Sequence, residues 1–242
     1  MESSENEILI KEIARSLKAM DYSMMSINGR EKKYMDIVLF FYYYSRYASD
    51  EQSEEFAGNL FEKVLSSPNI GRNFFYSTGL AGIGSNLLLL VKEGFVEFDS
   101  DDVFLQIDDL ITKIAKKYIR YDYSFSTGLT GLCHYILERK LYSDVIHAVL
   151  NRLISSFSTL NFQRSPISPM FLYPSEVLED VVLFAFLIEK ENLFPEQVLK
   201  LRSCIETFKQ NNKIFQSNCP EYGIIQQIRK ARIENNKQEI MS

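Results

Sequence analysis

The chain has 242 residues, of which 46% are hydrophobic and 24% are charged, as in an average soluble globular protein long enough to bury a core. Its formal net charge of −5 excludes the basic surface that binds nucleic acid or an anionic membrane. Three widely spaced cysteines exclude a disulfide framework, and no apolar run approaches the ~20 residues of a bilayer span, so we expect a reduced, cytoplasmic protein.

The N-terminal part of the chain is predicted to contain one helix and then a helical hairpin. Apolar residues recur at helical spacing over 6–20, a segment that lacks the basic start of a signal peptide. From Tyr34 to Tyr47 the chain is apolar nearly all round, as in a buried helix. An amphipathic helix follows the acidic stretch SDEQSEE, and the two helices together make a hairpin over 34–66.

Two further hairpins follow, each with a glycine-rich, more apolar helix before a more amphipathic one. The first covers 77–118, and Gly94 is well placed to end its first helix. The second covers 126–157, where Ser143 or Asp144 is placed to cap the amphipathic partner.

A fourth hairpin over 175–209 is weaker in pattern, with Pro195 at a first-turn position. An irregular connection, 161–174, precedes it, and a charged tail, helical or frayed, follows Gly223. Repeats of roughly 40–50 residues with two helices each indicate a solenoid or a toroid. No stretch alternates convincingly with period two. We therefore predict an all-α fold, a toroid-like array of about four helical hairpins (an incomplete α/α barrel), as a single domain over 1–242.

A nine-residue phrase occurs twice, at the start of the second and third hairpins. It reads YSTGLAGIG from Tyr76 and FSTGLTGLC from Phe125, 49 positions later. Ser-Thr before a helix predicts capping of its free amides, and Ile83 and Leu132 begin the buried stripe. Two interpretations of the glycines stay open: they relieve crowding near a common axis, or these helix N-termini line the mouth of a cavity that takes an anion or a carbonyl. The candidate ligand-binding residues are Tyr76, Ser77, Thr78, Gly79, Gly82, Phe125, Ser126, Thr127, Gly128 and Gly131.

This Ser-Thr-Gly-Leu-x-Gly phrase, repeated with a period near 49, resembles the lanthionine synthetase C-like family, best over 74–157 and more loosely over 34–209. The resemblance implies an α/α toroid with glycine-rich starts to its inner helices. Enzymes of that family are zinc-dependent cyclases that add a peptide cysteine thiol to a dehydrated Ser or Thr. The resemblance therefore implies a peptide substrate or a partner modification enzyme.

The zinc motif of the family is absent from its expected place. Family cyclases hold zinc with one cysteine and a Cys-His pair directly before a Gly-x-x-Gly, where this chain has Ser-Thr in both repeats. Cys133 and His134 are adjacent but follow the glycines inside a helix, where neighbouring side chains point about 100° apart. With Cys219, they are the only weak metal candidates. We expect no cofactor, and zinc only if the chain is a cyclase with a non-standard site.

Other catalytic signals are weak. The two histidines, including His147, are interpreted as structural, and no Ser-His-Asp set stands out. The carboxylate pairs Asp108-Asp109 and Glu179-Asp180 raise the alternative of a glycosidase-like toroid, but such pairs are common on solvated helix faces.

Three functional hypotheses follow. The first is a non-catalytic binding or accessory protein in peptide modification, in which aromatic stretches over 40–47, 73–77 and 119–126 supply a peptide-binding groove. The second is a peptide cyclase with a relocated zinc site, and the third is an unrelated helical-hairpin scaffold. Because an open arc of hairpins exposes inner-helix surface, a homodimer across that face is also predicted.

Overall fold

The chain is all-helical over the part that the computed structural model describes. That part comprises residues 2–22, 31–68, 70–97, 101–117, 122–141, 144–159 and 174–211. It contains nine helices and no strand, which confirms the all-α prediction. The helices are α1 (Glu2–Lys18), α2 (Glu31–Ala48), α3 (Glu51–Leu65), α4 (Leu80–Lys92), α5 (Asp101–Lys117), α6 (Leu129–Glu138), α7 (Asp144–Thr159), α8 (Pro174–Lys190) and α9 (Pro195–Asn211).

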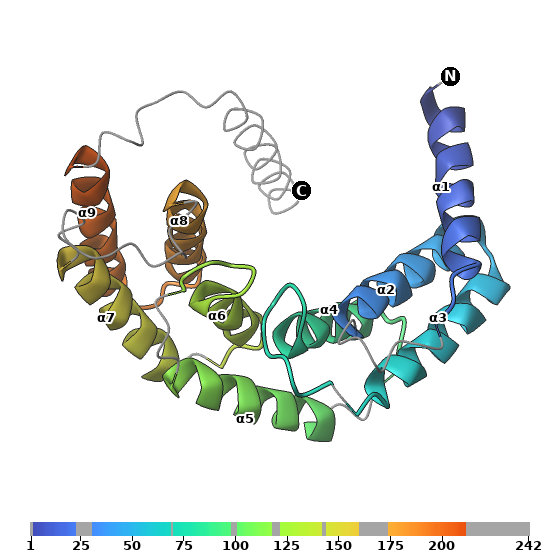
Figure 1. The fold of residues 1–242 in the computed structure, drawn as a ribbon, viewed down its shortest axis with the longest axis horizontal. Helices are drawn as coiled ribbons and strands as arrows, with labels where there is room; N and C mark the ends of the chain where they lie inside the picture. Colours follow the sequence, from blue (N-terminus) through green and yellow to red (C-terminus); the bar gives the residue numbers. More distant parts are fainter. Residues whose placement is uncertain are drawn as a thin grey trace.

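The helices pack as hairpins in two curved layers (Figure 1). The inner layer holds α2, α4, α6 and α8, and each of these helices contacts the next. The outer layer holds α3, α5, α7 and α9, with contacts from α5 to α7 and from α7 to α9. Figure 1 shows α1 and α8 at separate ends of the curve. The array of helical hairpins is confirmed, and its described helices form an open arc rather than a closed ring.

The helix ends lie near the residues expected from local signals. The hairpins begin at residues 31, 80, 129 and 174, where the sequence predicts starts at 34, 77, 126 and 175. Pro195 opens α9, since a proline at the first helical position has no amide hydrogen bond to lose. Gly94 follows the C-cap of α4 with a φ of 67°, a left-handed conformation that favours glycine. Ser143, most of the connection 161–174 and the predicted tail after Gly223 lie outside the described residues.

Helix α2 differs from the fully buried helix that is predicted over 34–47. Met35 and Phe41 are completely buried, but Tyr43 and Tyr47 are 41% and 63% exposed. The helix packs against α3 and α4 and only lightly against α1, so part of its circumference faces solvent. The prediction counted the tyrosines of this helix as buried apolar residues. A tyrosine ring can instead pack on the protein surface while its hydroxyl stays in water.

The buried core is built mainly from the inner helices. Ile83 and Leu132, at equivalent positions of α4 and α6, are 1% and 0% exposed, which confirms them as part of the buried stripe. Each contributes about 1.5–3 kcal/mol by burial. The core has two clusters, one centred on α1 to α4 and one reaching from α4 to α9, and α4 supplies residues to both. Helix α4 therefore joins the first hairpin to the rest of the arc.

Candidate functional site at the junction of the repeats

The residues that precede α4 and α6 fold back over the first turn of their own helix. Gly79 and Gly128 are the N-cap residues, and neither helix start has a side-chain capping bond. The first amide of α4 instead donates to the carbonyl of Asn73 at 2.8 Å, and that of α6 donates to the carbonyl of Asp122 at 2.9 Å. The predicted Ser-Thr capping is therefore wrong, because a carbonyl of the preceding loop already satisfies the first amide.

The glycines of both phrases leave room for this folded-back loop. A Cβ atom at Gly82 would lie 1.9 Å from the Tyr76 carbonyl oxygen, and one at Gly131 would lie 2.0 Å from that of Phe125. Any side chain at these positions would displace the loop. The backbone that approaches belongs to the same repeat, which favours the packing interpretation. The first amide of each helix is already bonded to its own loop and is therefore not available to an anion.

Sequence reasoning missed Asn73 and Asp122, which hold the two loops in shape. The side-chain oxygen of each accepts a hydrogen bond from the amide two residues later, at 3.0 Å in both loops, as in an Asx turn. Asn73 also donates to the Thr78 hydroxyl at 2.9 Å, and Asp122 accepts from the Thr127 hydroxyl at 2.9 Å. A signal was available, because both residues lie six positions before the first glycine of their phrase.

The two phrases meet directly. The amide and the hydroxyl of Ser77 donate to the carbonyl of Ser126 at 3.0 Å and 2.9 Å. The ring centroids of Tyr76 and Phe125 lie 4.4 Å apart. The amide of Phe125 donates to the Asp180 carboxylate of α8 at 2.8 Å, which ties the third hairpin to the fourth. The structure thus brings the polar and aromatic candidates of the two phrases to one seam.

His134 of α6 lies against both aromatic rings of this seam. Its ring centroid is 5.2 Å from that of Tyr76 and 5.1 Å from that of Phe125, in edge-on contacts. These residues and the neighbouring hydroxyl groups are all at least partly exposed. We name the group the junction surface, and it consists of Tyr76, Ser77, Phe125, Ser126, Thr127 and His134.

One turn beyond His134, Glu138 links α6 to α4. Its carboxylate accepts a hydrogen bond from the Ser85 hydroxyl and lies 3.7 Å from His134 Nδ1. Burial raises the pKa of Glu138, but His134 and the bond from Ser85 outweigh it, so the pKa is lowered overall. Among the described residues, His134 Nδ1 is buried without a hydrogen-bond partner. Because Ser85 donates to the carboxylate and not to the imidazole, these groups do not form a nucleophilic relay.

The weak metal candidates are not gathered into one site. Cys133 is completely buried in the core, and burial raises the pKa of its thiol, whereas zinc binds the thiolate. Cys219 lies outside the described residues. Within the described part of the chain, no three His, Cys, Asp or Glu side chains are grouped closely enough to hold a metal ion. His147 is also elsewhere, with its ring tilted against Phe194 at 5.3 Å.

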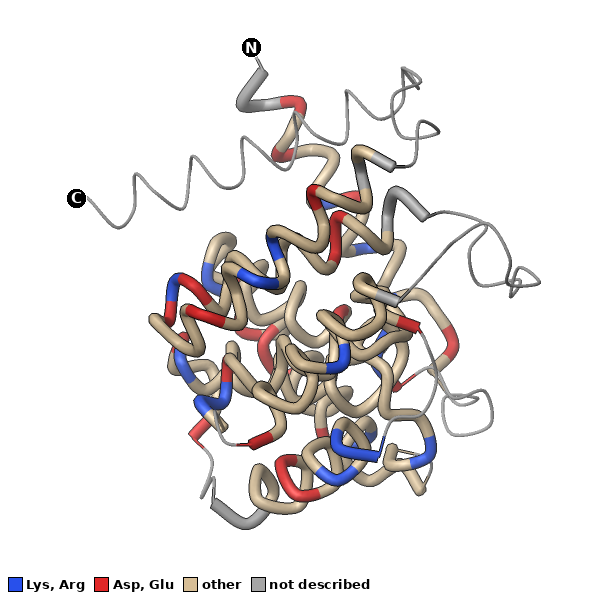
Figure 2. The backbone as a smooth tube through the Cα atoms, turned by 90° about the vertical axis from the view of Figure 1, so that its left-hand side faces the viewer, with Lys and Arg blue, Asp and Glu red and all other residues tan. Residues whose placement is uncertain are grey.

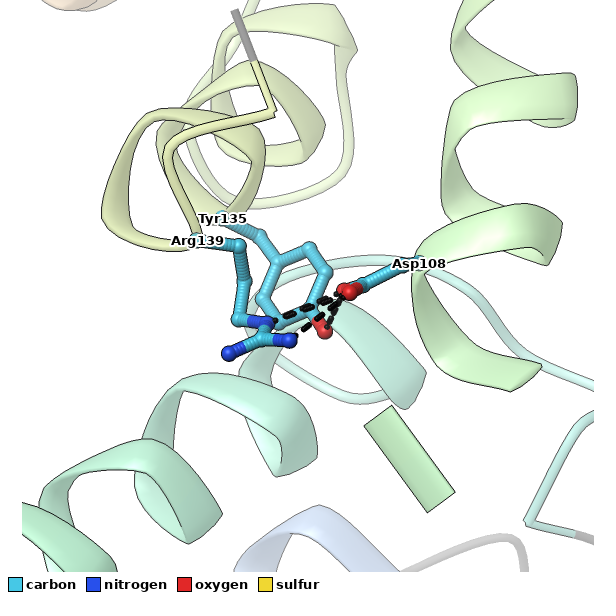
Figure 3. Close-up of polar contacts among 3 residues, drawn as sticks. All are labelled: Asp108, Tyr135 and Arg139. Carbon is cyan, nitrogen blue, oxygen red and sulfur yellow. Dashed lines mark hydrogen bonds and ion pairs between the residues drawn. The ribbon is translucent and has the colours of Figure 1, made fainter. Parts of the chain in front are cut away.

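The candidate carboxylate pairs do not face each other across a cleft. Asp108 is 6% exposed and accepts hydrogen bonds from the Tyr135 hydroxyl at 2.6 Å and from Arg139 at 2.9 Å (Figure 3). Its neighbour Asp109 instead pairs with a lysine of α5 on an exposed surface. Asp180 binds the backbone of the junction. Asp108 therefore joins α5 to α6, and the glycosidase-like alternative gains no support from its position.

Surface charge, helix hydropathy and similarity to known proteins do not assign the chain to a family. Figure 2 shows acidic and basic residues interspersed along the visible helices. None of the described helices combines the length and the apolar character needed to cross a membrane. Comparison with known protein families, curated proteins and solved structures finds no match. The described part of the chain is an arc of α-helical hairpins with a partly exposed aromatic seam.

Proposed function

We propose that the chain is a non-catalytic, peptide-binding protein of the lanthionine synthetase C-like type that assists peptide modification. The junction surface is the observation that carries the proposal. There, Tyr76, Phe125 and His134 form a partly exposed aromatic group at the seam of the two repeats that resemble that family.

The construction of the junction surface suits a peptide ligand. Aromatic rings supply contact area at a low cost in conformational entropy. The bonds from Ser77 to Ser126 and from Phe125 to Asp180 hold the seam in place before a ligand arrives, which reduces the entropy lost on binding. Ser126 and Thr127 are exposed, and hydroxyl groups can donate to or accept from a peptide backbone.

Peptide binding is tested by fluorescence anisotropy with labelled short peptides rich in Ser, Thr and Cys. We expect Phe125→Leu and His134→Gln each to weaken binding about tenfold, as loss of a central interface contact does. Leu199→Ala is the matched control, because Leu199 is 66% exposed on the outer helix α9, and it should bind like the wild type. Equal affinity in all three variants would move the binding site elsewhere, and no binding by the wild type would overturn the proposal.

Metal content separates this proposal from the cyclase hypothesis. Mass spectrometry of the purified chain should show no stoichiometric zinc if the protein is non-catalytic. Near-stoichiometric zinc that is lost in Cys133→Ser would instead support a cyclase, because a thiolate is the preferred zinc ligand.

A further inference from the structure

An open groove lies between α2, α3 and the segment 94–97 that follows α4. It lies mostly on the first hairpin and shares no residue with the junction surface. Its volume is about 640 Å³, within the range typical of ligand sites. It is lined by the largely apolar residues Tyr42, Phe61, Leu65 and Val96 and by the acidic residues Glu62 and Glu97.

Tyr42 brings a polar atom to this groove. The residue is only 5% exposed, and its ring packs against Phe95 with centroids 5.3 Å apart. Its hydroxyl has no hydrogen-bond partner in the described part of the chain, and the hydroxyl oxygen keeps contact with solvent. Burial, and then the charges of Glu54 and Glu62, raise the pKa of Tyr42. The hydroxyl therefore keeps its proton and can donate or accept a hydrogen bond.

Gly58 keeps the space in front of this hydroxyl open. It lies inside α3, where glycine destabilises a helix relative to alanine. Gly82 and Gly131 are required by a close backbone contact, but Gly58 is not. A Cβ atom at Gly58 would lie 3.7 Å from the Tyr42 hydroxyl oxygen, an ordinary contact distance. The glycine therefore has no steric role within the described chain, and it preserves access to the hydroxyl.

The groove is acidic and therefore favours a positively charged ligand. Among the described residues, neither Glu62 nor Glu97 takes part in an ion pair. Glu62 lies in the last turn of α3, where the helix carbonyls add negative potential. Lys63 lies in the same turn but does not line the groove. Arg46 of α2 is already paired with Glu93 at 3.6 Å.

We propose that this groove binds a lysine or arginine side chain of a partner peptide. The aliphatic stem packs on Phe61 and Val96, and the cationic end pairs with Glu62 and Glu97 and donates a hydrogen bond to the Tyr42 hydroxyl. The apolar lining favours a long side chain over a small inorganic cation. This inference does not rest on the proposed function, because peptide binding in the groove does not require peptide binding at the junction surface.

The experiment is titration calorimetry of the full chain with an acetylated, amidated lysine oligomer, compared with a glutamine oligomer of equal length. We expect the lysine peptide to bind and Glu62→Gln/Glu97→Gln to weaken it about tenfold. Gly58→Ala should weaken binding several-fold while raising the melting temperature, so its effect does not come from unfolding. The matched control is Glu12→Gln/Glu196→Gln, which removes the same charge from exposed positions on α1 and α9 and should bind like the wild type.

Three outcomes would overturn the proposal. The lysine peptide could bind no better than the glutamine peptide. The control pair could lose as much affinity as Glu62→Gln/Glu97→Gln, which would show general attraction to an acidic chain. Finally, sedimentation could show a dimer that Glu62→Gln/Glu97→Gln dissociates, in which case the groove holds a second copy of the chain and not a peptide.

Discussion

The loop before α4 and the loop before α6 reach the same geometry with different side chains. In the first, Asn73 donates an amide hydrogen to the Thr78 hydroxyl; in the second, Asp122 accepts from the Thr127 hydroxyl. The threonine reverses its role, while the Asx turn and the close approach over glycine are the same in both loops. The close backbone approach therefore defines the loop, and the side-chain hydrogen bond adapts to it.

The two repeats differ more where inner and outer helices meet. Tyr135 of α6 and Arg139, the C-cap residue of α6, bind the buried Asp108 of α5. The corresponding positions of α4, 49 residues earlier, are Asn86 and Leu90. Asn86 donates to a carboxylate of α2, and Leu90 is completely buried in the core. A partly buried ion pair thus joins α5 to the end of α6 at this site. At the equivalent site of α4, apolar packing and a hydrogen bond to the preceding inner helix take its place.

The largest expected effect comes from breaking the feature that the two loops share. Gly131→Ala should lower the free energy of unfolding by about 3 kcal/mol, because its Cβ would overlap the Phe125 carbonyl. The matched control is Gly71→Ala, since a Cβ there has nothing within 4 Å, and it should change stability by less than about 0.5 kcal/mol. Urea unfolding followed by circular dichroism measures both. Equal stability of the two variants would show that the loop can move away without cost.

An intermediate effect comes from Tyr135→Phe, which removes a bond found only in the second repeat. Burial, and then the bond to Asp108 and its charge, raise the pKa of Tyr135. Because the pKa of Tyr135 is higher in the folded than in the unfolded chain, its protonated form contributes stability below the unfolded-state pKa of ~10. Above that pH the free energy of unfolding falls by about 1.4 kcal/mol per pH unit. Tyr135→Phe should cost about 1 kcal/mol at pH 7 and should lose stability less steeply above pH ~10 than the wild type.

Urea unfolding at a series of pH values from neutral to alkaline tests this expectation. Tyr43, whose pKa burial also raises, provides the control Tyr43→Phe, because it is 41% exposed and lacks the buried carboxylate partner. Parallel alkaline slopes for the wild type and Tyr135→Phe would contradict the assigned role of Tyr135.

A substitution that gives the first loop the side chain of the second should have little effect on stability. Asn73→Asp should change the free energy of unfolding by less than about 1 kcal/mol, because the threonine hydroxyl can turn from acceptor to donor. Asn73→Ala is the matched comparison and should cost about 1–2 kcal/mol, since it removes the Asx turn as well. If Asn73→Asp were as damaging as Asn73→Ala, the two loops would not be interchangeable.

Much of the fold was predictable because it depends on local pattern. The 3.6-residue periodicity and the end signals, Pro195 and Gly94 among them, act within one or two helical turns. The repeated phrase also indicated equivalent hairpins. The site was less predictable: Ser-Thr pointed to capping, but a carbonyl at Asn73 or Asp122 takes that role. Local sequence does not show whether a side-chain hydroxyl or a backbone carbonyl of the preceding loop accepts the hydrogen bond from the first helical amide.

The helices, their pairing as repeats and the need for glycine at two helix starts follow from the sequence alone. These properties follow from side-chain periodicity and from the absence of a Cβ atom. The contacts of His134 with Tyr76 and Phe125, and the place of Tyr42 in the lining of a groove, depend on the tertiary structure. Those contacts join residues far apart in the chain, and their geometry depends on how whole helices pack against one another.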